Sequence, residues 1–322
     1  MIVIAPDKFK GTYTADEICR LVKSRLLNAG INSPVYCCPL SDGGEGVASM
    51  LMPERKQLST GVYEHNGQRL VVSSEIVGFD AFFGSGLPLM RRSSYELGRA
   101  VKPGIPTTIA VGGTATSDCG AGFLQGLGGR FYDRNGREIH DQLCPETLMS
   151  VASADLSSLD KYDMSGVIDV RASLIEGPLT ALDFAGQKAF PGESLSLLKE
   201  VFAHFQQIVG GSSEWDGAGG GIGFALASVC RSVCRSGADI AVKSIGISDG
   251  TIDLVITGEG CVDRQTLYGG KLPDAVFRHY SARNIPVLIL YGKKTDGFPY
   301  PYMAQIDSEW ESLVKCILSR ES

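Results

Sequence analysis

The sequence predicts an α/β fold with mostly parallel sheets, in which strands and helices alternate along the chain. Short apolar runs recur, partly β-branched and closely followed by Gly, Asp or Thr, as is typical of buried strands. Stretches with helical spacing lie between them, and this alternation indicates parallel pairing. The predicted strands are residues 2–5, 34–39, 107–111, 167–170, 253–257 and 286–290.

Capping and spacing predict the helices. Thr14 and Glu17 form a capping box ahead of an apolar stripe, so a helix is expected to begin after Thr14. Trp310 and the apolar residues that follow it keep helical spacing near the end of the chain. Cys230 and Cys234 are one helical turn apart, and we expect both on the core side of one helix.

Composition argues against several classes of function. The 322 residues carry a formal net charge of −6 with no long run of one sign, whereas a nucleic-acid-binding protein has a basic face. Nine irregularly spaced cysteines and four scattered histidines favour reduced thiols over disulfides or a zinc site. The chain shows no apolar run of membrane-span length and no signal peptide, so a cytoplasmic protein that does not contact membranes is expected.

Acidic side chains follow four of the predicted strands, each among glycines or lysines. Because ligands of a parallel sheet bind beyond the carboxyl ends of its strands, this recurrence predicts an active site. The four segments are residues 7–11 (DKFKG), 41–46 (SDGGEG), 112–120 (GGTATSDCG) and 258–263 (GEGCVD).

These residue types fit phosphoryl transfer. Glycine turns at helix starts offer N–H groups to phosphate, lysines supply positive charge, and carboxylates hold Mg²⁺ or accept the proton of an attacking hydroxyl. A Walker A motif is absent, because residues 265–272 lack its first glycine and its final Ser or Thr. The candidate cations are Lys8, Lys10 and Lys271, and the candidate acids are Asp7, Asp42, Asp118, Glu259 and Asp263.

The acids have structural alternatives. Asp42 and Asp118 each precede a predicted helix, so capping and function are evenly balanced for both. Glu259 lies between two glycines, which is harder to explain as a cap and favours function. Asp263 supports a functional role less strongly than Glu259 does.

The lysines and the glycine-rich segment are also open to two interpretations. Lys8 and Lys10 flank Phe9 directly after the first strand, which favours a ligand role over a solvated surface. Residues 217–223 (GAGGGIG) depart from G-x-G-x-x-G at Ile222, and they either bind phosphate or pack a helix start closely.

Taken in order, these segments resemble the bacterial type-1 glycerate kinase family over nearly the whole chain. Residues 4–11 (IAPDKFKG) are similar to its A-P-D-S-F-K-G, and residues 39–46 (PLSDGGEG) to its P-x-A-D-G-G-E-G. Further matches follow at residues 85–89 (SGLPL), 112–122 (GGTATSDCGAG), 217–223, 256–266 (ITGEGCVDRQT) and 270–273 (GKLP).

The resemblance implies two α/β domains, one inserted into the other. Residues 1–65 and 245–322 would form a discontinuous flavodoxin-like domain, and residues 66–244 the inserted one. It also implies a site in the cleft between them, ATP and Mg²⁺ as cofactors, and D-glycerate as the substrate. The expected product is 2-phosphoglycerate, with 3-phosphoglycerate as the alternative. The resemblance does not fix the oligomeric state, and a homodimer is one of the possibilities.

Site roles follow from the resemblance and the pattern together. The catalytic candidates are Asp42, Asp118, Lys10 and Asp7, and the metal candidates are Glu259 and Asp263. Substrate or nucleotide binding is assigned to Lys8, Gly43, Gly44, Ser85, Gly112, Gly113, Thr116, Gly219, Gly220, Gly221, Gly258 and Lys271.

The chain departs from the family between residues 169 and 189. The family's D-V-x-N-P-L reads DVRASL here, so the Asn and the Pro are replaced by Ala172 and Ser173. Cys261 and Lys8 replace an arginine and a serine of the family pattern. Two alternatives therefore stand beside glycerate kinase: a kinase of another small hydroxy-acid or sugar acid, and a non-catalytic nucleotide-binding relative.

Overall fold

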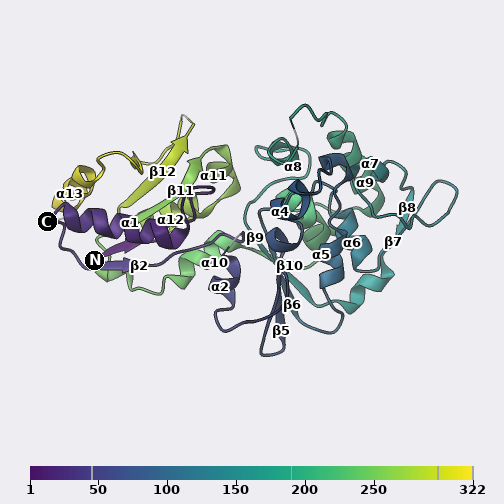
Figure 1. The fold of residues 1–322 in the computed structure, drawn as a ribbon, viewed down its shortest axis with the longest axis horizontal. Coiled ribbons are helices and arrows are strands. Elements are labelled where there is room, and N and C mark those ends of the chain that lie inside the picture. Colours follow the sequence, from purple (N-terminus) through teal and green to yellow (C-terminus); the bar gives the residue numbers. More distant parts are fainter. Residues whose placement is uncertain (45, 190, 296, 321–322) are drawn as a thin grey trace. The chain divides into compact units, whose positions relative to one another are not determined.

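The computed structural model describes residues 1–44, 46–189, 191–295 and 297–320, and the chain divides into two compact units (Figure 1). Unit 1 consists of Met1–Asp42 and Gly237–Ser322, and unit 2 is the inserted stretch Gly43–Ser236. Both junctions lie earlier than the boundaries expected after residues 65 and 244. The first differs because β3 (Lys56–Ser59) and β4 (Val62–His65) pair within the sheet of unit 2.

Unit 1 is built on a five-stranded sheet with the order β13-β12-β11-β1-β2, in which every neighbouring pair is parallel. Counted within the unit, this is the flavodoxin-like order 2-1-3-4-5, and the winding reverses between β1 and β11. The prediction of an α/β fold with mostly parallel pairing is confirmed. The strands are β1 (Ile2–Ile4), β2 (Val35–Cys37), β11 (Leu254–Val262), β12 (Val287–Lys294) and β13 (Tyr302–Gln305).

Helix α1 (Ala15–Asn28) begins as the sequence predicts. The Glu17 N–H donates to the Thr14 hydroxyl, and the Thr14 N–H donates to the Glu17 carboxylate, so both halves of the capping box form. Its apolar stripe shares one buried core with β1 and with α13 (Glu311–Arg320), the predicted C-terminal helix. The other helices of unit 1 are α10 (Gly237–Ser244), α11 (Arg264–Gly269) and α12 (Leu272–Ser281).

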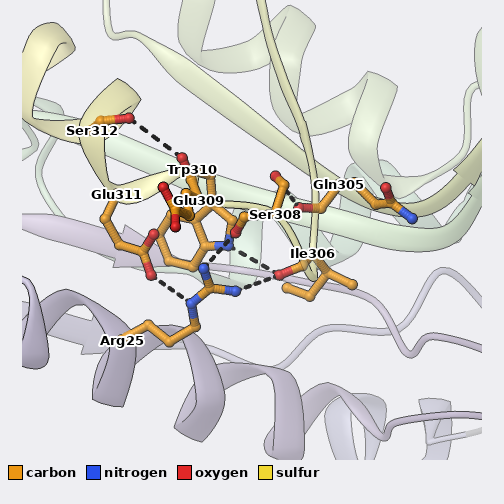
Figure 2. Close-up of polar contacts among 8 residues, drawn as sticks. All are labelled: Arg25, Gln305, Ile306, Ser308, Glu309, Trp310, Glu311 and Ser312. Atoms are coloured by element: carbon orange, nitrogen blue, oxygen red, sulfur yellow. Dashed lines mark hydrogen bonds and ion pairs between the residues drawn. The ribbon is translucent and has the colours of Figure 1, made fainter.

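Arg25 ties α1 to the segment before α13 (Figure 2). Its guanidinium donates to Glu311 Oε1 at 2.5 Å, to the Ile306 carbonyl at 2.6 Å and to the Ser308 carbonyl. It also lies over the Trp310 ring, 4.7 Å from the ring centroid. The planar guanidinium thus donates several hydrogen bonds with its N–H groups and stacks on an aromatic ring at the same time. A lysine ammonium group cannot reproduce this combination.

Replacing Arg25 by alanine is expected to destabilise unit 1 by about 2–4 kcal/mol, because Glu311 and two carbonyls lose a charged donor together. Urea unfolding measures this loss. Arg20→Ala is the matched control, since Arg20 is exposed on the same helix and should change stability by less than about 0.5 kcal/mol. Equal losses in the two variants would mean that the Arg25 contacts contribute nothing beyond the helix itself.

Unit 2 contains a six-stranded sheet with the order β10-β9-β6-β5-β4-β3. The first four strands are mutually parallel, and the last two add antiparallel pairs. A short antiparallel pair, β7 with β8, forms separately. Besides β3 and β4, the strands are β5 (Gln68–Val72), β6 (Thr107–Val111), β7 (Arg130–Tyr132), β8 (Ser153–Asp155), β9 (Met164–Ile168) and β10 (Val233–Ser236).

The helices of unit 2 are short, except for α9 (Leu198–Val209). Most of them pack with the sheet around a large apolar core that includes Phe123, Phe202 and Phe224, whereas Val47 and Ala48 of α2 belong to a separate cluster with strand residues. The remaining helices are α2 (Val47–Leu51), α3 (Ser73–Ile76), α4 (Phe79–Phe83), α5 (Tyr95–Ala100), α6 (Ala121–Gly126), α7 (Pro145–Leu148) and α8 (Ala181–Ala185).

The prediction that Cys230 and Cys234 share a helix is wrong. Phe224–Val229 forms a π-helical turn that ends at Cys230, and Arg231 then takes a left-handed conformation with φ 53°. Cys234 lies in β10 instead. Both thiols are half-buried against the core of unit 2, and all nine cysteines are free in the described chain. Within the same described residues, no helix is both long and apolar enough to span a membrane.

Candidate functional site

Three carboxylates meet at the carboxyl ends of neighbouring strands in unit 1. Asp7 follows β1, Asp42 follows β2, and Glu259 lies in the second half of β11. Since β1 lies between β11 and β2, the topology brings the three to one edge of the sheet, beside the point where the winding reverses. This is the position at which open α/β sheets bind ligands.

The glycines on either side of Glu259 allow close backbone packing there. A Cβ on Gly258 would lie 2.2 Å from the Leu290 carbonyl oxygen, and one on Gly260 would lie 3.1 Å from the Lys10 nitrogen. Larger residues would push β11 away from β12 and from the loop after β1. The two glycines thus hold Glu259 within the packed edge, where only 7% of it is exposed.

Burial is the largest influence on the pKa values of the acids at this edge. Burial raises the pKa of Asp7 well above its ordinary value, and the negative charges of Asp42 and Glu259 raise it further, against the Lys8 N–H bond and the Lys8 charge. Burial raises the pKa of Glu259 to about 7, while Lys271 and the Thr266 hydroxyl lower it and Asp42 and Asp263 raise it. Such shifted carboxyl groups are typical of functional sites.

The Glu259 shift predicts a pH-dependent cost to folding. A carboxyl with a pKa of about 7 when folded and 4.5 when unfolded favours the folded state below pH 4.5, and this contribution is lost as pH rises through 7. Glu259→Gln should therefore raise the free energy of unfolding at pH 8 by up to roughly 3 kcal/mol, and by little at pH 4. Urea unfolding at both pH values measures the difference.

Glu17→Gln is the control for that comparison. Glu17 is exposed, and its pKa is lowered because it accepts hydrogen bonds from the Thr14 backbone and side chain. Its replacement should therefore give no gain at pH 8. A Glu259→Gln protein that gains nothing at pH 8 would contradict the buried position of this carboxyl group.

Residues after Glu259 belong to a second capping box. The Asp263 carboxylate accepts the Gln265 N–H at 2.8 Å as the N-cap of α11, which gives this residue a structural role. The Thr266 hydroxyl donates to Glu259 Oε1. Gly270 ends α11 with φ 65°, and the next residue, Lys271, donates from Nζ to Gln265 Oε1 at 3.2 Å.

The loop after β1 is closed by Phe9, which is 2% exposed. The Phe9 N–H donates to the Tyr13 carbonyl at 2.8 Å, and the Tyr13 N–H donates to the Phe9 carbonyl at 2.9 Å. Lys8 and Lys10 flank this anchor, Lys8 half-buried with its N–H on Asp7 Oδ1 at 2.7 Å, and Lys10 exposed. The buried phenyl ring thus fixes where both lysines leave the backbone.

Asp118 lies in unit 2 and is fully buried. Its Oδ2 accepts the Ser94 N–H at 2.6 Å, the Ser94 hydroxyl at 2.7 Å and the Gly122 N–H at 3.2 Å, and its Oδ1 accepts the Gly120 N–H at 3.2 Å. Burial raises its pKa, against the lowering effect of these donors. These contacts give Asp118 a structural role at the start of α6, although the N-cap residue itself is Gly120.

The glycine-rich loop after β6 is packed tightly within unit 2. The Gly112 N–H donates to Ser73 Oγ at 3.2 Å, and a Cβ on Gly112 would lie 2.9 Å from Asp169 Oδ2. Gly113 has φ 64°, and Thr116 is fully buried. Lys188, which the sequence did not single out as a site residue, donates from Nζ to Thr114 Oγ1 at 3.2 Å and to the Thr116 carbonyl at 2.8 Å.

The glycine-rich segment 217–223 packs against this loop. A Cβ on Gly220 would lie 2.0 Å from the Thr116 carbonyl oxygen, and one on Gly221 would lie 2.3 Å from the Cys119 Cα. Gly219 has φ 61° and approaches Val111. Close packing thus accounts for three glycines that the sequence assigned to ligand binding, and that role stays a prediction.

The remaining binding candidates of unit 2 lie on two loops. Gly43 has φ 132°, and its Cβ position lies 3.3 Å from the Asp169 nitrogen, while the Gly44 carbonyl accepts the Val47 N–H at the start of α2. Glu45 of the same motif lies outside the described residues. Ser85 is exposed and donates to the Phe82 carbonyl at 2.6 Å, so it forms a local turn after α4.

The acids of unit 1 fit Mg²⁺ by donor chemistry. Among the described residues, no three His, Cys, Asp or Glu side chains are arranged to hold a metal ion. Magnesium is usually bound by one or two protein carboxylates, with waters and phosphates completing its shell. Asp7, Asp42 and Glu259 offer only oxygen donors, and the repulsion that raises the pKa of Asp7 and Glu259 is of the kind that a cation relieves.

Sequence reasoning missed Thr266 as a partner of Glu259. Its signal was present, because Asp263 followed by Thr266 three residues later has capping-box spacing. The hydroxyl's second bond reaches back to Glu259 in the preceding strand, β11, and the capping pattern does not encode that contact. Lys188 carried only a weak signal, since a single lysine after a short helix is usually solvated.

Known proteins resemble this chain over almost all of its length. A model of the glycerate kinase family matches residues 2–319. A glycerate kinase of Bacillus subtilis strain 168 is 29% identical, with 95% of this chain and 88% of that protein covered. A glycerate 2-kinase of Escherichia coli strain K12 is 27% identical, with 97% and 90% covered.

A solved structure shares the fold. It is a crystal structure from Salmonella typhimurium LT2 of a protein proposed to be glycerate kinase 2, with a TM-score of 0.65 and 22% identity, covering 98% of this chain and 94% of that one. The two-unit architecture with the flavodoxin-like order is thus accompanied by a family match along both units. The chain belongs to the glycerate kinase family of enzymes.

Proposed function

We propose that this enzyme transfers the γ-phosphoryl group of ATP to a hydroxyl of D-glycerate. The observation that carries the proposal is the group of three carboxylates, Asp7, Asp42 and Glu259, at the carboxyl ends of β1, β2 and β11 in a chain of this family. Phosphoryl transfer needs a base for the acceptor hydroxyl and groups that balance the phosphate charge. The acids, the lysines and the glycine N–H groups supply both.

Asp42 is our candidate for accepting the proton of the attacking hydroxyl. Asp118 is the alternative, but all of its hydrogen bonds hold backbone and side-chain donors of unit 2 in a site without solvent exposure. Lys10 and Lys271 are proposed to balance phosphate charge as compact cations. Glu259 is proposed to hold Mg²⁺ in preference to Asp263, whose carboxylate caps α11. Bound Mg²⁺ would neutralise charge on the phosphate oxygens.

The proposed product is 2-phosphoglycerate, because the Escherichia coli relative is named glycerate 2-kinase. A coupled assay of ADP release with D-glycerate, ATP and Mg²⁺ tests the activity. Phosphorus NMR of the product identifies the acceptor, since a phosphate on the secondary carbon couples to one carbon-bound proton and a phosphate on the primary carbon to two. No ADP release above background would refute the proposal, and coupling to two protons would change the product to 3-phosphoglycerate.

A second candidate is phosphorylation of another small hydroxy-acid or sugar acid. It is favoured by one local difference, the apolar Ala172 in place of an asparagine of the family pattern. Ala172 is buried, its N–H donates to the Glu214 carbonyl at 2.9 Å, and its carbonyl accepts the Gly217 N–H at 2.7 Å. A panel of hydroxy-acids compared by kcat/KM distinguishes the candidates, because a clear preference over D-glycerate would favour the second.

A further inference from the structure

Thr266 uses one hydroxyl for two hydrogen bonds. It is the third residue of α11 and is fully buried. Its Oγ1 accepts the Asp263 N–H at 3.1 Å and donates to Glu259 Oε1. A hydroxyl has a single proton, so accepting from the backbone directs that proton to the carboxylate. The start of α11 therefore holds Glu259 through Thr266.

We propose that Thr266 is a positioning residue, which orients the Glu259 carboxylate toward the divalent cation that accompanies the nucleotide. This inference rests on the proposed function, in which Glu259 holds that cation. Carboxylates that bind metals are commonly fixed by a hydrogen bond from a neighbouring group, and losing that group weakens metal binding by about 10–100-fold. The bond to Oε1 restrains the rotation of a side chain whose two neighbours in the chain are glycines.

The capping box of α7 shows that a bond to an acid is not required for capping. Thr147 occupies the equivalent third position of α7, and its Oγ1 accepts the Cys144 N–H at 3.0 Å. There the hydroxyl donates to the Cys144 carbonyl, 3.1 Å away, and not to a carboxylate. Capping therefore accounts for the backbone bond of Thr266 but not for its contact with Glu259.

The test is calorimetric titration of the full-length protein with ADP, once with Mg²⁺ and once with EDTA. The ratio of the two affinities reports the contribution of the metal. Thr266→Val should reduce this ratio by about ten-fold or more, because valine has the same shape without the hydroxyl. Thr266→Ser restores the hydroxyl and should keep the wild-type ratio. Thr147→Val loses a comparable capping bond and should also keep it, which separates positioning from general destabilisation.

Two results of the titration would contradict the proposed role of Thr266. A Thr266→Val protein with the wild-type ratio would overturn the inference, and so would a wild-type protein whose ADP affinity is the same with Mg²⁺ and with EDTA. Failure of the proposed function can be told apart from failure of this inference. The titration contains no acceptor, so its result does not change if the enzyme does not phosphorylate glycerate. In the kinase assay, Thr266→Val should lower kcat and raise the Mg²⁺ concentration needed for half-maximal rate, with little change in KM for glycerate.

Discussion

Replacing Asp42 by asparagine is expected to lower kcat for glycerate phosphorylation by about 10²–10⁴-fold, the range for losing a general base. Stability should stay unchanged or increase, because the Asp42 charge raises the pKa of both Asp7 and Glu259 through repulsion. Loss of activity together with a gain in stability is the signature of a carboxylate that serves chemistry and opposes folding. The coupled assay and urea unfolding measure the two effects on one preparation.

Asp307→Asn is the matched control for Asp42→Asn. Asp307 is an exposed carboxylate of the same unit, so the same change of charge should leave kcat and stability close to wild type. Wild-type kcat in the Asp42→Asn protein would remove the proposed base. A large fall in stability with the fall in kcat would show instead that Asp42 is needed to hold the fold.

Asp118→Asn is expected to destabilise the protein by about 2–4 kcal/mol. Four N–H or O–H donors converge on this buried carboxylate, and asparagine has one oxygen and an NH₂ group to offer them. The loop it holds includes Cys119 at φ 58° and Gly120 at φ 69°, which depend on these bonds to stay in place. Thermal and urea unfolding measure the loss.

Asp133→Asn provides the comparison for Asp118. Asp133 also accepts two backbone N–H bonds, from Asn135 and Arg137, but it lies in an exposed turn where water replaces a lost partner. The Asp133→Asn variant should therefore lose less than about 1 kcal/mol of unfolding free energy. If Asp118→Asn folds with wild-type stability and has no activity, the carboxylate belongs to catalysis, the alternative that the sequence left open.

Parallel strands such as β1 and β6 were predictable because they are buried on both faces. The run at Thr107–Val111 matches β6 in full, and the runs near residues 2, 34, 253 and 286 match strands of unit 1 within a few residues. By contrast, β3 (Lys56–Ser59) is fully exposed, and its sequence KQLS contains no apolar run. Its strand conformation depends on pairing with β4, which no local pattern encodes.

The candidate site was predictable to a similar degree. Strand ends rich in acid and glycine pointed to Asp7, Asp42 and Glu259, and parallel pairing explains why the structure gathers them in unit 1. The same pattern could not separate Asp118 from them, because a buried cap and a catalytic acid use the same residue type at the same place. Only the donors around each carboxylate distinguish the two, and Ser94 lies far from Asp118 in the sequence.

The discontinuity of unit 1 has a consequence for how the enzyme is made. A ribosome completes β1 and β2 first, and then the whole of Gly43–Ser236, before β11 leaves the exit tunnel. Until then β1 has β2 but not β11 beside it, and Asp7 and Asp42 exist without Glu259. Unit 2 is continuous and can complete its sheet during synthesis, which shortens the effective loop that β1 and β11 must close. The acidic edge is therefore among the last features of the nascent protein to assemble.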